Sequence, residues 1–319
     1  MTRNEARPTR RFVRKLVDNW HWGMTHGWVD LIEEHDVNPF VRGRRAFRKA
    51  RWRWTNRLRG ERPTPVFLLG AQRSGTNMMV HGLDELAQVQ VYNEGNARAF
   101  ENFRLRPLET IEALVERSWA EFVVFKPLCD SHRAVELLDN FTPRARVIWA
   151  YRAVEGRVRS AVAKFGDSNL RVLRAYAAGE AGNAWQVQGV SSENADFIKS
   201  FDLDRLSAES GAALFWYVRN SLYFEMSLDG RENVMLLSYD QLLADPEGVA
   251  ASVCRFVGLD YRRDLIAHIK PHRHVVSKPL EIDSRIRERC EELQERLDRS
   301  ALDTSRVRSP DDRTAPRYR

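Results

Sequence analysis

The chain has 319 residues, of which 43% are hydrophobic and 30% charged, so it is long enough to bury a substantial core. No apolar run reaches the roughly 18 to 20 residues that cross a bilayer, and the N-terminus lacks the apolar core of a signal peptide. Three cysteines without C-x-x-C spacing predict neither a disulfide framework nor a thiolate metal site. We therefore expect a globular cytoplasmic protein.

The net charge of +7 is concentrated at the N-terminus. Residues 1–62 hold 16 Lys and Arg against 7 Asp and Glu, a local charge of +9, which leaves about −2 for the rest of the chain. The main domain is therefore close to neutral. A pI of 9.5 for the whole chain does not indicate nucleic-acid binding, and no nucleic-acid partner is expected.

Residues 1–62 are predicted to form a basic, aromatic-rich helical arm. Apolar residues recur at three- or four-residue steps over 12–31 and again over 47–58, and five of the nine tryptophans lie in the arm. The second stretch, RGRRAFRKARWRW, combines a cationic face with tryptophans. Two interpretations of the arm remain open: the helices pack on the main domain, or they contact an anionic membrane. Binding of nucleic acid by the arm is a third and weaker alternative. The segment RGERPTP then ends the arm as a linker.

Residues 63–303 are predicted to form one α/β domain. Short apolar runs at 66–69, 122–125, 146–150 and 233–238 indicate strands buried on both faces. Helical patterns lie near 76–88, 131–139, 154–165, 207–228 and 246–257. This alternation predicts a P-loop-like doubly wound parallel sheet with helices on both faces. Residues 166–205 have no clean period and are interpreted as an insertion covering the site, whereas 304–319 is predicted to be a disordered tail.

The stretch PVFLLGAQRSGTNMMVHGL reads as a strand, a turn bounded by two glycines, and a helix, which is the pattern of a phosphate-binding loop. Gly70 and Gly75 have the spacing of a nucleoside triphosphatase loop, but Thr76 occupies the lysine position. Arg73 offers forked donors that match an oxyanion with several oxygens. The missing lysine argues against ATP. The alternative is that the glycines only form a tight turn.

Two further segments make the pattern more specific. In VIWAYRAVEGRVRSAVAKFG a strand ends at Tyr151, and Arg152 is followed eight residues later by Ser160. Farther on lies LLSYDQLLADPEGVAASVCRFVGL. With GAQRSGTN, these segments resemble the sulfotransferases that use 3'-phosphoadenosine 5'-phosphosulfate (PAPS), over about residues 65–280. The Arg-Ser-Gly-Thr form is similar to the bacterial and tyrosylprotein branches of that family.

The resemblance implies a set of donor-binding residues. Those assigned to the 5'-phosphosulfate are Arg73, Ser74, Gly75, Thr76 and Asn77. Those assigned to the 3'-phosphate are Arg152 and Ser160, with Lys164 on the same helical face. Tyr239 would border the adenine, and Lys278 would close over the nucleotide. Lys164 has the alternative of a solvated helix lysine.

Sulfuryl transfer needs a base for the acceptor and cations for the leaving bisphosphate, and it requires no metal. Glu94 lies 21 residues after Arg73, which is the offset of the basic glutamate in the resembled branch, so it is assigned as the general base. Lys126 directly follows a predicted strand. Together with Arg73, it would stabilise the charge of the transferring sulfuryl group. His132 is the rival base. The histidines at 268, 272 and 274 have no carboxylate or cysteine company and predict no metal site.

The predicted function is transfer of a sulfuryl group from PAPS to a hydroxyl or amine. The alternatives are a small-molecule kinase or other P-loop NTPase, and a non-catalytic nucleotide-binding protein peripheral to the membrane. The acceptor is left open between a glycan, a lipid, a small phenolic molecule and a peptide tyrosine. Variable loops would choose it, here residues 95–120 and 166–205.

Overall fold

The computed structural model describes residues 39–56, 62–269 and 278–304. Two compact units, residues 1–56 and 57–319, are each described by themselves. In the first unit, the second predicted arm helix is present as α3 (Pro39–Thr55). The arm helix expected over 12–31, the linker around 57–61 and the tail from 305 onward lie outside the described residues. None of the described helices is long and apolar enough to span a bilayer.

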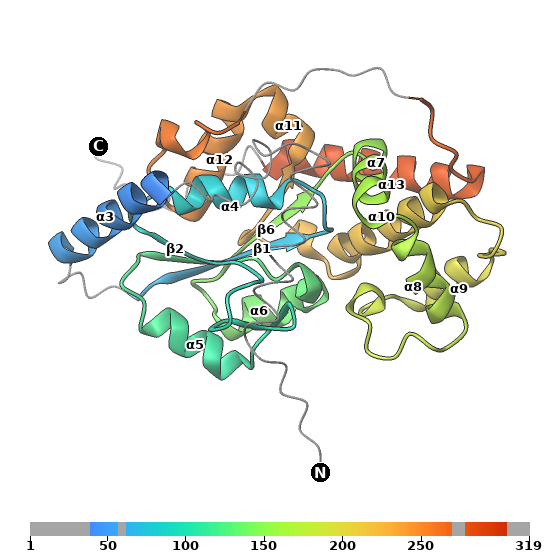
Figure 1. The fold of residues 1–319 in the computed structure, drawn as a ribbon, viewed down its shortest axis with the longest axis horizontal. Coiled ribbons are helices and arrows are strands. Elements are labelled where there is room, and N and C mark those ends of the chain that lie inside the picture. The colour runs from blue at the N-terminus through green and yellow to red at the C-terminus, as the bar shows by residue number, and fades with distance from the viewer. Residues whose placement is uncertain (1–38, 57–61, 270–277, 305–319) are drawn as a thin grey trace, which may run out of the picture. The chain divides into compact units, whose positions relative to one another are not determined.

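The larger unit is built on a five-stranded parallel sheet with the strand order β2-β5-β1-β6-β7 (Figure 1). Its strands are β1 (Thr64–Gly70), β2 (Val89–Tyr92), β5 (Phe122–Phe125), β6 (Arg146–Tyr151) and β7 (Val234–Ser238). A separate antiparallel hairpin pairs β3 (Phe100–Glu101) with β4 (Arg104–Leu105). Because β1 lies in the middle and the chain continues on either side of it, the carboxyl end of β1 is the topological switch point.

Helices follow the strands on both faces of the sheet. They are α4 (Thr76–Asp84), α5 (Leu108–Glu116), α6 (Ala134–Asn140), α7 (Val154–Phe165), α8 (Ser168–Ala177), α9 (Ser192–Lys199), α10 (Ala208–Glu225), α11 (Tyr239–Ala244), α12 (Pro246–Val257) and α13 (Ser284–Thr304). Short 3-10 turns are η1 (Leu128–Arg133), η2 (Trp185–Val187), η3 (Leu228–Gly230) and η4 (Arg263–Leu265). The predicted doubly wound α/β class is confirmed.

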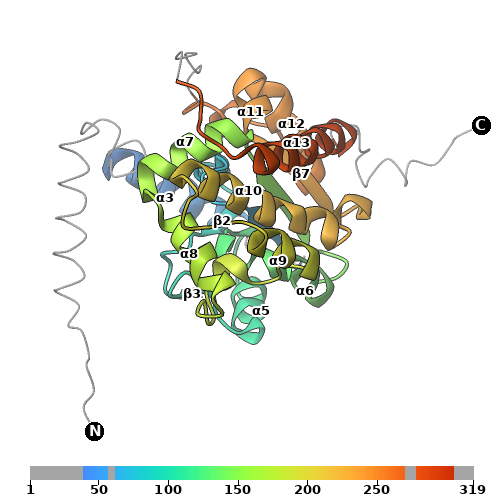
Figure 2. The same ribbon diagram turned by 90° about the vertical axis from the view of Figure 1, so that its right-hand side faces the viewer.

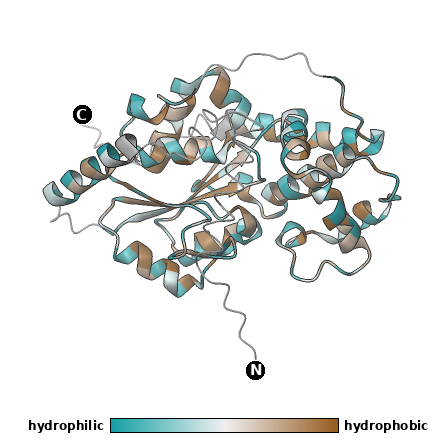
Figure 3. Cartoon of the chain, in the orientation of Figure 1, coloured by the Kyte–Doolittle hydropathy of each residue, from teal (hydrophilic) through white to brown (hydrophobic). Residues whose placement is uncertain are grey.

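The alternation of side chains along the buried strands produces two cores. In β1, Phe67 and Leu69 pack in the core that contains α5, α6, α10 and α13, whereas Val66 and Leu68 pack in the core under α4 and α12. The helices carry hydrophobic residues toward the sheet and hydrophilic ones elsewhere, so brown and teal alternate along them in Figure 3. Helix α10, which is buried on most of its surface, packs between α7, α8 and α13 (Figure 2).

Several predicted elements need correction. The edge strand β2 was not predicted, and residues 166–205 are not irregular, because they contain α8 and α9. Helix α8 forms because Leu170 and Leu173 bury one apolar face against the core, although its other residues are polar. The helix expected over 76–88 ends at Asp84, and the one expected from 131 begins only at Ala134, after η1.

Candidate active site

The loop between β1 and α4 depends on two glycines. Gly70 and Gly75 have φ of 121° and 77°, which L side chains rarely adopt. A Cβ on Gly70 would lie 2.1 Å from the Ala150 carbonyl oxygen, and one on Gly75 would lie 2.0 Å from the Tyr239 ring. The Gly70 N–H donates to the Ser131 hydroxyl at 3.0 Å, which ties the loop to η1. The chain can therefore turn sharply and place the start of α4 at the switch point.

The inner wall of this loop offers hydrogen-bond donors. Ser74 is 2% exposed, and its hydroxyl has no hydrogen-bond partner among the described residues. Thr76 is also buried, and no side chain caps the N-terminus of α4. Buried polar atoms are normally paired, and helix N-terminal N–H groups attract anions. The loop therefore fits an anionic ligand such as a phosphate or a phosphosulfate.

The structure brings the second predicted motif against this loop. Arg73, with φ of 69°, donates from Nε to the Ser160 hydroxyl of α7 at 2.9 Å. Arg152, at the end of β6, lies over the Tyr239 ring at 4.6 Å, and its Nε is buried without a partner among the described residues. Lys164 is exposed one helical turn beyond Ser160. Arg73, in the loop after β1, and Arg152, directly after β6, thus both lie at the carboxyl end of the parallel sheet.

Tyr239 and Lys278 differ in how the structure places them. Tyr239 begins α11, and its ring packs on Gly75, so it borders the loop directly. The Ser238 hydroxyl accepts from the Gln241 N–H and caps that helix, which fixes the start of α11. Lys278 is exposed and directly follows the undescribed residues 270–277. Its predicted place over the nucleotide stays a prediction.

Arg157 was not identified from the sequence, and its side chain stabilises the loop by hydrogen bonding. It is fully buried on α7 and donates from Nε to the Gln72 carbonyl oxygen at 3.3 Å and from Nη1 to the Ala212 carbonyl oxygen at 2.8 Å. Burial lowers the pKa of Arg157 to about 9, so the side chain is still charged at neutral pH. The sequence did contain a signal that Arg157 is buried, because it lies on the same helical face as the apolar Val154, Val158 and Ala161.

A chain of polar contacts joins the loop to the predicted base. Lys126 Nζ donates to the Asn77 side-chain oxygen at 2.6 Å and forms an ion pair with Glu94 Oε2 at 3.1 Å. The side chains of Lys126 and Glu94 are only 9% and 15% exposed. Strand β2 explains this meeting, because Tyr92 is in register with Phe125 of β5. Lys126 and Glu94 therefore both lie just past the carboxyl ends of neighbouring parallel strands.

The environment of Glu94 favours proton uptake. Burial raises the pKa of Glu94 above its ordinary value, and the attraction of Lys126 lowers it only in part. The second carboxylate oxygen, Oε1, is buried with no hydrogen-bond partner among the described residues. Glu94 is therefore a stronger base than an exposed glutamate, and its buried Oε1 makes no hydrogen bond that would compete for a proton among the described residues.

The rival base His132 lies in a different environment. Burial lowers the pKa of His132 to about 4, and the nearby positive charges of Arg219 and Arg104 contribute to the shift. Its ring borders Gly189, where an added Cβ would lie 2.7 Å from the His132 Cβ. No hydrogen bond or ion pair within the described part of the chain joins His132 to Glu94 or Lys126. The geometry thus favours Glu94 over His132.

The histidine cluster predicted to hold no metal is only partly described. His268 stacks on His81 with ring centroids 4.4 Å apart and contacts the Met78 carbonyl oxygen at 2.9 Å. His272 and His274 lie outside the described residues. Across the described ranges, no three His, Cys, Asp or Glu side chains lie close enough together to hold a metal ion.

Comparison with known proteins identifies the family. The model of the sulfotransferase domain matches residues 63–275. No curated protein matched this chain. A solved sulfotransferase domain from the Synechococcus PCC 7002 olefin synthase is 14% identical, with a TM-score of 0.38, and the match covers 74% of this chain and 96% of that domain.

Two other solved structures are similarly distant. The sulfotransferase domain from the curacin biosynthetic pathway is 12% identical with a TM-score of 0.45, and the match covers 73% of this chain and 98% of the other. A sulfotransferase from Alicyclobacillus acidocaldarius is 12% identical with a TM-score of 0.41, and the match covers 76% and 95% of the two chains. The family model spans about two-thirds of the sequence and includes the loop, Glu94, Lys126 and the Arg152 segment. The chain therefore belongs to the sulfotransferase family.

Proposed function

We propose that this enzyme transfers a sulfuryl group from PAPS to a hydroxyl or amine acceptor by in-line displacement. The observation that carries the proposal is the contact chain Asn77–Lys126–Glu94, which links the anion-binding loop to a buried basic carboxylate. The lack of a Walker lysine at Thr76 supports PAPS over ATP as the donor. Together these features support a site that combines an anion cradle, a cation and a base.

The residues present fit the donor. The unpartnered hydroxyl of Ser74 and the uncapped start of α4 suit the 5'-phosphosulfate, with Arg73, Gly75, Thr76 and Asn77 around it. Arg152 has a buried Nε without a partner among the described residues, which suits the 3'-phosphate, together with Ser160 and Lys164. Tyr239 would border the adenine, and Lys278 would close over it. PAPS supplies an activated sulfuryl group; the protein's own groups bind, orient and neutralise charge.

In this proposal, Glu94 accepts the acceptor's proton on Oε1, the oxygen that has no partner among the described residues. Lys126 is within ion-pair distance of Glu94 and hydrogen-bonded to Asn77, so one ammonium group can hold the base in place and face the transferring group. Arg73 adds a second cation at the loop, held by Ser160. No metal has a role in this scheme.

Calorimetric titration tests the donor. We expect the protein to bind 3'-phosphoadenosine 5'-phosphate (PAP) and to bind ATP with magnesium far more weakly. A preference for ATP with magnesium would favour the kinase or NTPase alternative. Binding of PAP with no transfer of label from PAPS to any acceptor in a cell extract would favour the non-catalytic nucleotide-binding alternative.

We expect Arg152→Ala to weaken PAP binding by about 10- to 150-fold, because a charge-assisted hydrogen bond worth roughly 1.5–3 kcal/mol is lost. Calorimetry measures the change directly. The matched control is Arg171→Ala, since Arg171 is an exposed arginine of the neighbouring helix α8 that pairs with Asp167. Equal affinity of the Arg152 variant and the wild type would contradict the assignment.

The pH dependence should report the ionisation of Glu94. A base must be deprotonated, so kcat/KM should fall as the pH drops through the Glu94 pKa. Because burial raises that pKa, this acidic limb should lie at a higher pH than an ordinary glutamate would produce. A pH–rate profile in buffers of constant ionic strength measures it. A profile that stays flat down to the ordinary glutamate range would contradict the prediction.

The class of acceptor and the cellular location of the enzyme are also part of this proposal. A small molecule, glycan, lipid or peptide acceptor is compatible with the family. We propose a cytoplasmic enzyme whose residues 1–62 contact anionic membrane, supported by the cationic, tryptophan-containing helix α3. The rest of this arm lies largely outside the described residues.

A further inference from the structure

The side chain of Arg152 lies folded against the first turn of α7. Its guanidinium carbon is 4.6 Å from the centre of the Tyr239 ring. A Cβ added to Gly156 would lie 2.8 Å from Arg152 Nε and 3.2 Å from its Nη2, so Arg152 occupies space that a larger residue at 156 would take. The direction of the guanidinium therefore depends on where the first turn of α7 lies.

The backbone around Arg152 is held by side chains of other elements. Ala153, the residue before α7, makes no side-chain cap, so the first N–H groups of that helix need acceptors from elsewhere. Asp240 Oδ2, in α11, accepts from the Ala153 N–H at 2.7 Å. Trp216 of α10 donates from Nε1 to the Arg152 carbonyl oxygen at 2.8 Å. Two helices thus fix the backbone at Arg152 and directly after it.

Helix α13 supplies two more contacts to the same segment. Gln294 Oε1 accepts from the Val154 N–H at 2.9 Å, and Asp298 Oδ1 accepts from the Tyr151 hydroxyl at 2.6 Å. Gln294 and Asp298 are four residues apart and so lie on one face of α13. Tyr151 is only 1% exposed and directly precedes Arg152. Helix α13 therefore holds the chain on both sides of Arg152.

The two polar residues are separate from the apolar face that anchors α13. The helix packs on α10 and β7 (Figure 2), and its buried residues belong to the large core. They are Ile286, Cys290, Leu293, Leu297 and Ala301. Gln294 and Asp298 are half-buried beside this row. The family model ends at residue 275, before α13 begins, so the match does not include these two residues.

We propose that Gln294 and Asp298 are positioning residues that hold Arg152 in place for the 3'-phosphate of the donor. This inference rests on the proposed function. The two side chains act through the Val154 N–H and the Tyr151 hydroxyl and do not touch the donor. Without these contacts the first turn of α7 would fray, and the Arg152 guanidinium would lose its fixed direction. A nucleotide without a 3'-phosphate would lose little.

The test compares PAP with 5'-AMP, which lacks the 3'-phosphate, in calorimetric titrations of the full chain. Gln294→Met keeps the length of the side chain but removes its carbonyl oxygen, and we expect PAP affinity to fall about five- to tenfold and AMP affinity by less than about twofold. Equal losses for the two nucleotides, or unchanged PAP affinity, would overturn the proposal. Failure of the wild type to bind PAP would instead reject the proposed function.

Substitutions of Asp298 test the second contact. Asp298→Leu removes the acceptor of the Tyr151 hydroxyl and should weaken PAP binding with little effect on AMP. Asp298→Asn keeps a side-chain oxygen at the same place and should retain wild-type affinity for both nucleotides. A loss of PAP affinity in Asp298→Asn as large as in Asp298→Leu would show that the hydrogen bond is not what matters, and would remove Asp298 from the proposal.

A double-mutant cycle tests the route through Val154 with PAP alone. Val154→Pro removes the N–H that Gln294 accepts from, and proline suits this place because Val154 is the first residue of α7 and Ala153 before it has an extended ψ of 137°. In this background Gln294→Met should cause no further loss of PAP affinity. A loss as large as that caused by Gln294→Met alone would contradict the proposed route.

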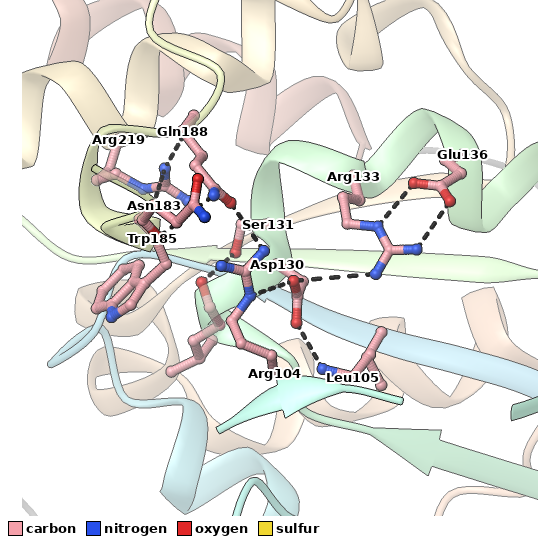
Figure 4. Close-up of polar contacts among 11 residues, drawn as sticks. Arg104, Leu105, Asp130, Ser131, Arg133, Glu136, Asn183, Trp185, Gln188 and Arg219 are labelled. Carbon is pink, nitrogen blue, oxygen red and sulfur yellow. Dashed lines mark hydrogen bonds and ion pairs between the residues drawn. The ribbon is translucent and has the colours of Figure 1, made fainter. Parts of the chain in front are cut away.

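Gln188→Met is the matched control, because it makes the same change at another half-buried glutamine that accepts a hydrogen bond. Gln188 accepts from Arg104 Nη2 at 2.8 Å, in a cluster where the fully buried Asp130 accepts from Arg104 Nε at 2.6 Å and from the Leu105 N–H at 2.7 Å (Figure 4). We expect a similar fall in Tm for both variants but wild-type PAP affinity in Gln188→Met. Comparable loss of PAP affinity in both would mean that destabilisation alone weakens donor binding, and would overturn the proposal.

Discussion

Glu94→Gln is expected to lower kcat by about 100-fold or more while PAP binds with unchanged affinity. The substitution keeps the shape of the side chain but removes its ability to take a proton, and general base catalysis contributes roughly 10²- to 10⁴-fold. PAP affinity should not fall, because in the proposed site Glu94 faces the acceptor and its charge has the same sign as the nucleotide phosphates, so its neutralisation removes no attraction to PAP. Steady-state kinetics with labelled PAPS and calorimetry with PAP measure the two effects separately.

His132→Gln is the matched control for Glu94→Gln. Burial and neighbouring arginines lower the pKa of His132 to about 4, so at neutral pH it is uncharged, and its replacement by a neutral side chain leaves the local charge unchanged. We expect little loss of kcat. The acidic limb of the pH–rate profile should disappear in Glu94→Gln and persist in His132→Gln. The reverse pattern would assign the base to His132.

The sheet was predictable where strands are buried on both faces. The run FVVF became β5 at residues 122–125, as expected for four consecutive aromatic and β-branched residues, which are typical of a strand buried on both faces. Strand β2 was missed, since it is a four-residue edge strand that includes the polar Gln90. Its conformation depends on pairing with β5, which lies about 30 residues away in the sequence and is not visible as a local pattern.

Site residues on local motifs were easier to find than those that support them. The loop at Gly70–Gly75 and the spacing of Arg152 and Ser160 are short-range features, and the structure places Arg73 beside Ser160. Arg157 and Asp130 could not be assigned in the same way. Their partners, the Gln72 and Ala212 carbonyl groups and the Arg104 side chain, come from other elements and are set by tertiary packing.

Glu94 shows how local sequence and tertiary packing together define a site residue. The sequence alone left it in an apparent turn marked by Asn93 and Gly95, where a surface glutamate was the alternative to the assigned base. The register of β2 with β5 places it instead beside Lys126, with most of its side chain buried. Its basicity follows from that burial. No property of the local sequence determines how far a carboxylate is removed from water.

Lys126→Met is expected to lower kcat by roughly 100- to 1000-fold, comparable to the loss of one preorganised donor in an oxyanion site. Methionine keeps the length and apolar stem of lysine, so the variant should fold, but it removes the ammonium that joins Asn77 to Glu94. Single-turnover kinetics with saturating PAPS measure the chemical step free of product release. Lys199→Met, at an exposed lysine of α9, is the control and should keep wild-type kcat.

The same variant has a second consequence that a merely structural lysine would not produce. Lys126 lowers the pKa of Glu94 through its charge and its hydrogen bond, in opposition to burial. Without it, the lowering by Lys126 is lost while burial still raises the Glu94 pKa, so that pKa should rise further and the residual activity should require a higher pH than the wild type does. A pH–rate profile of Lys126→Met therefore shows its acidic limb moved to higher pH. An unshifted limb, or near-normal kcat, would contradict the role of Lys126 in both binding the transferring group and tuning the base.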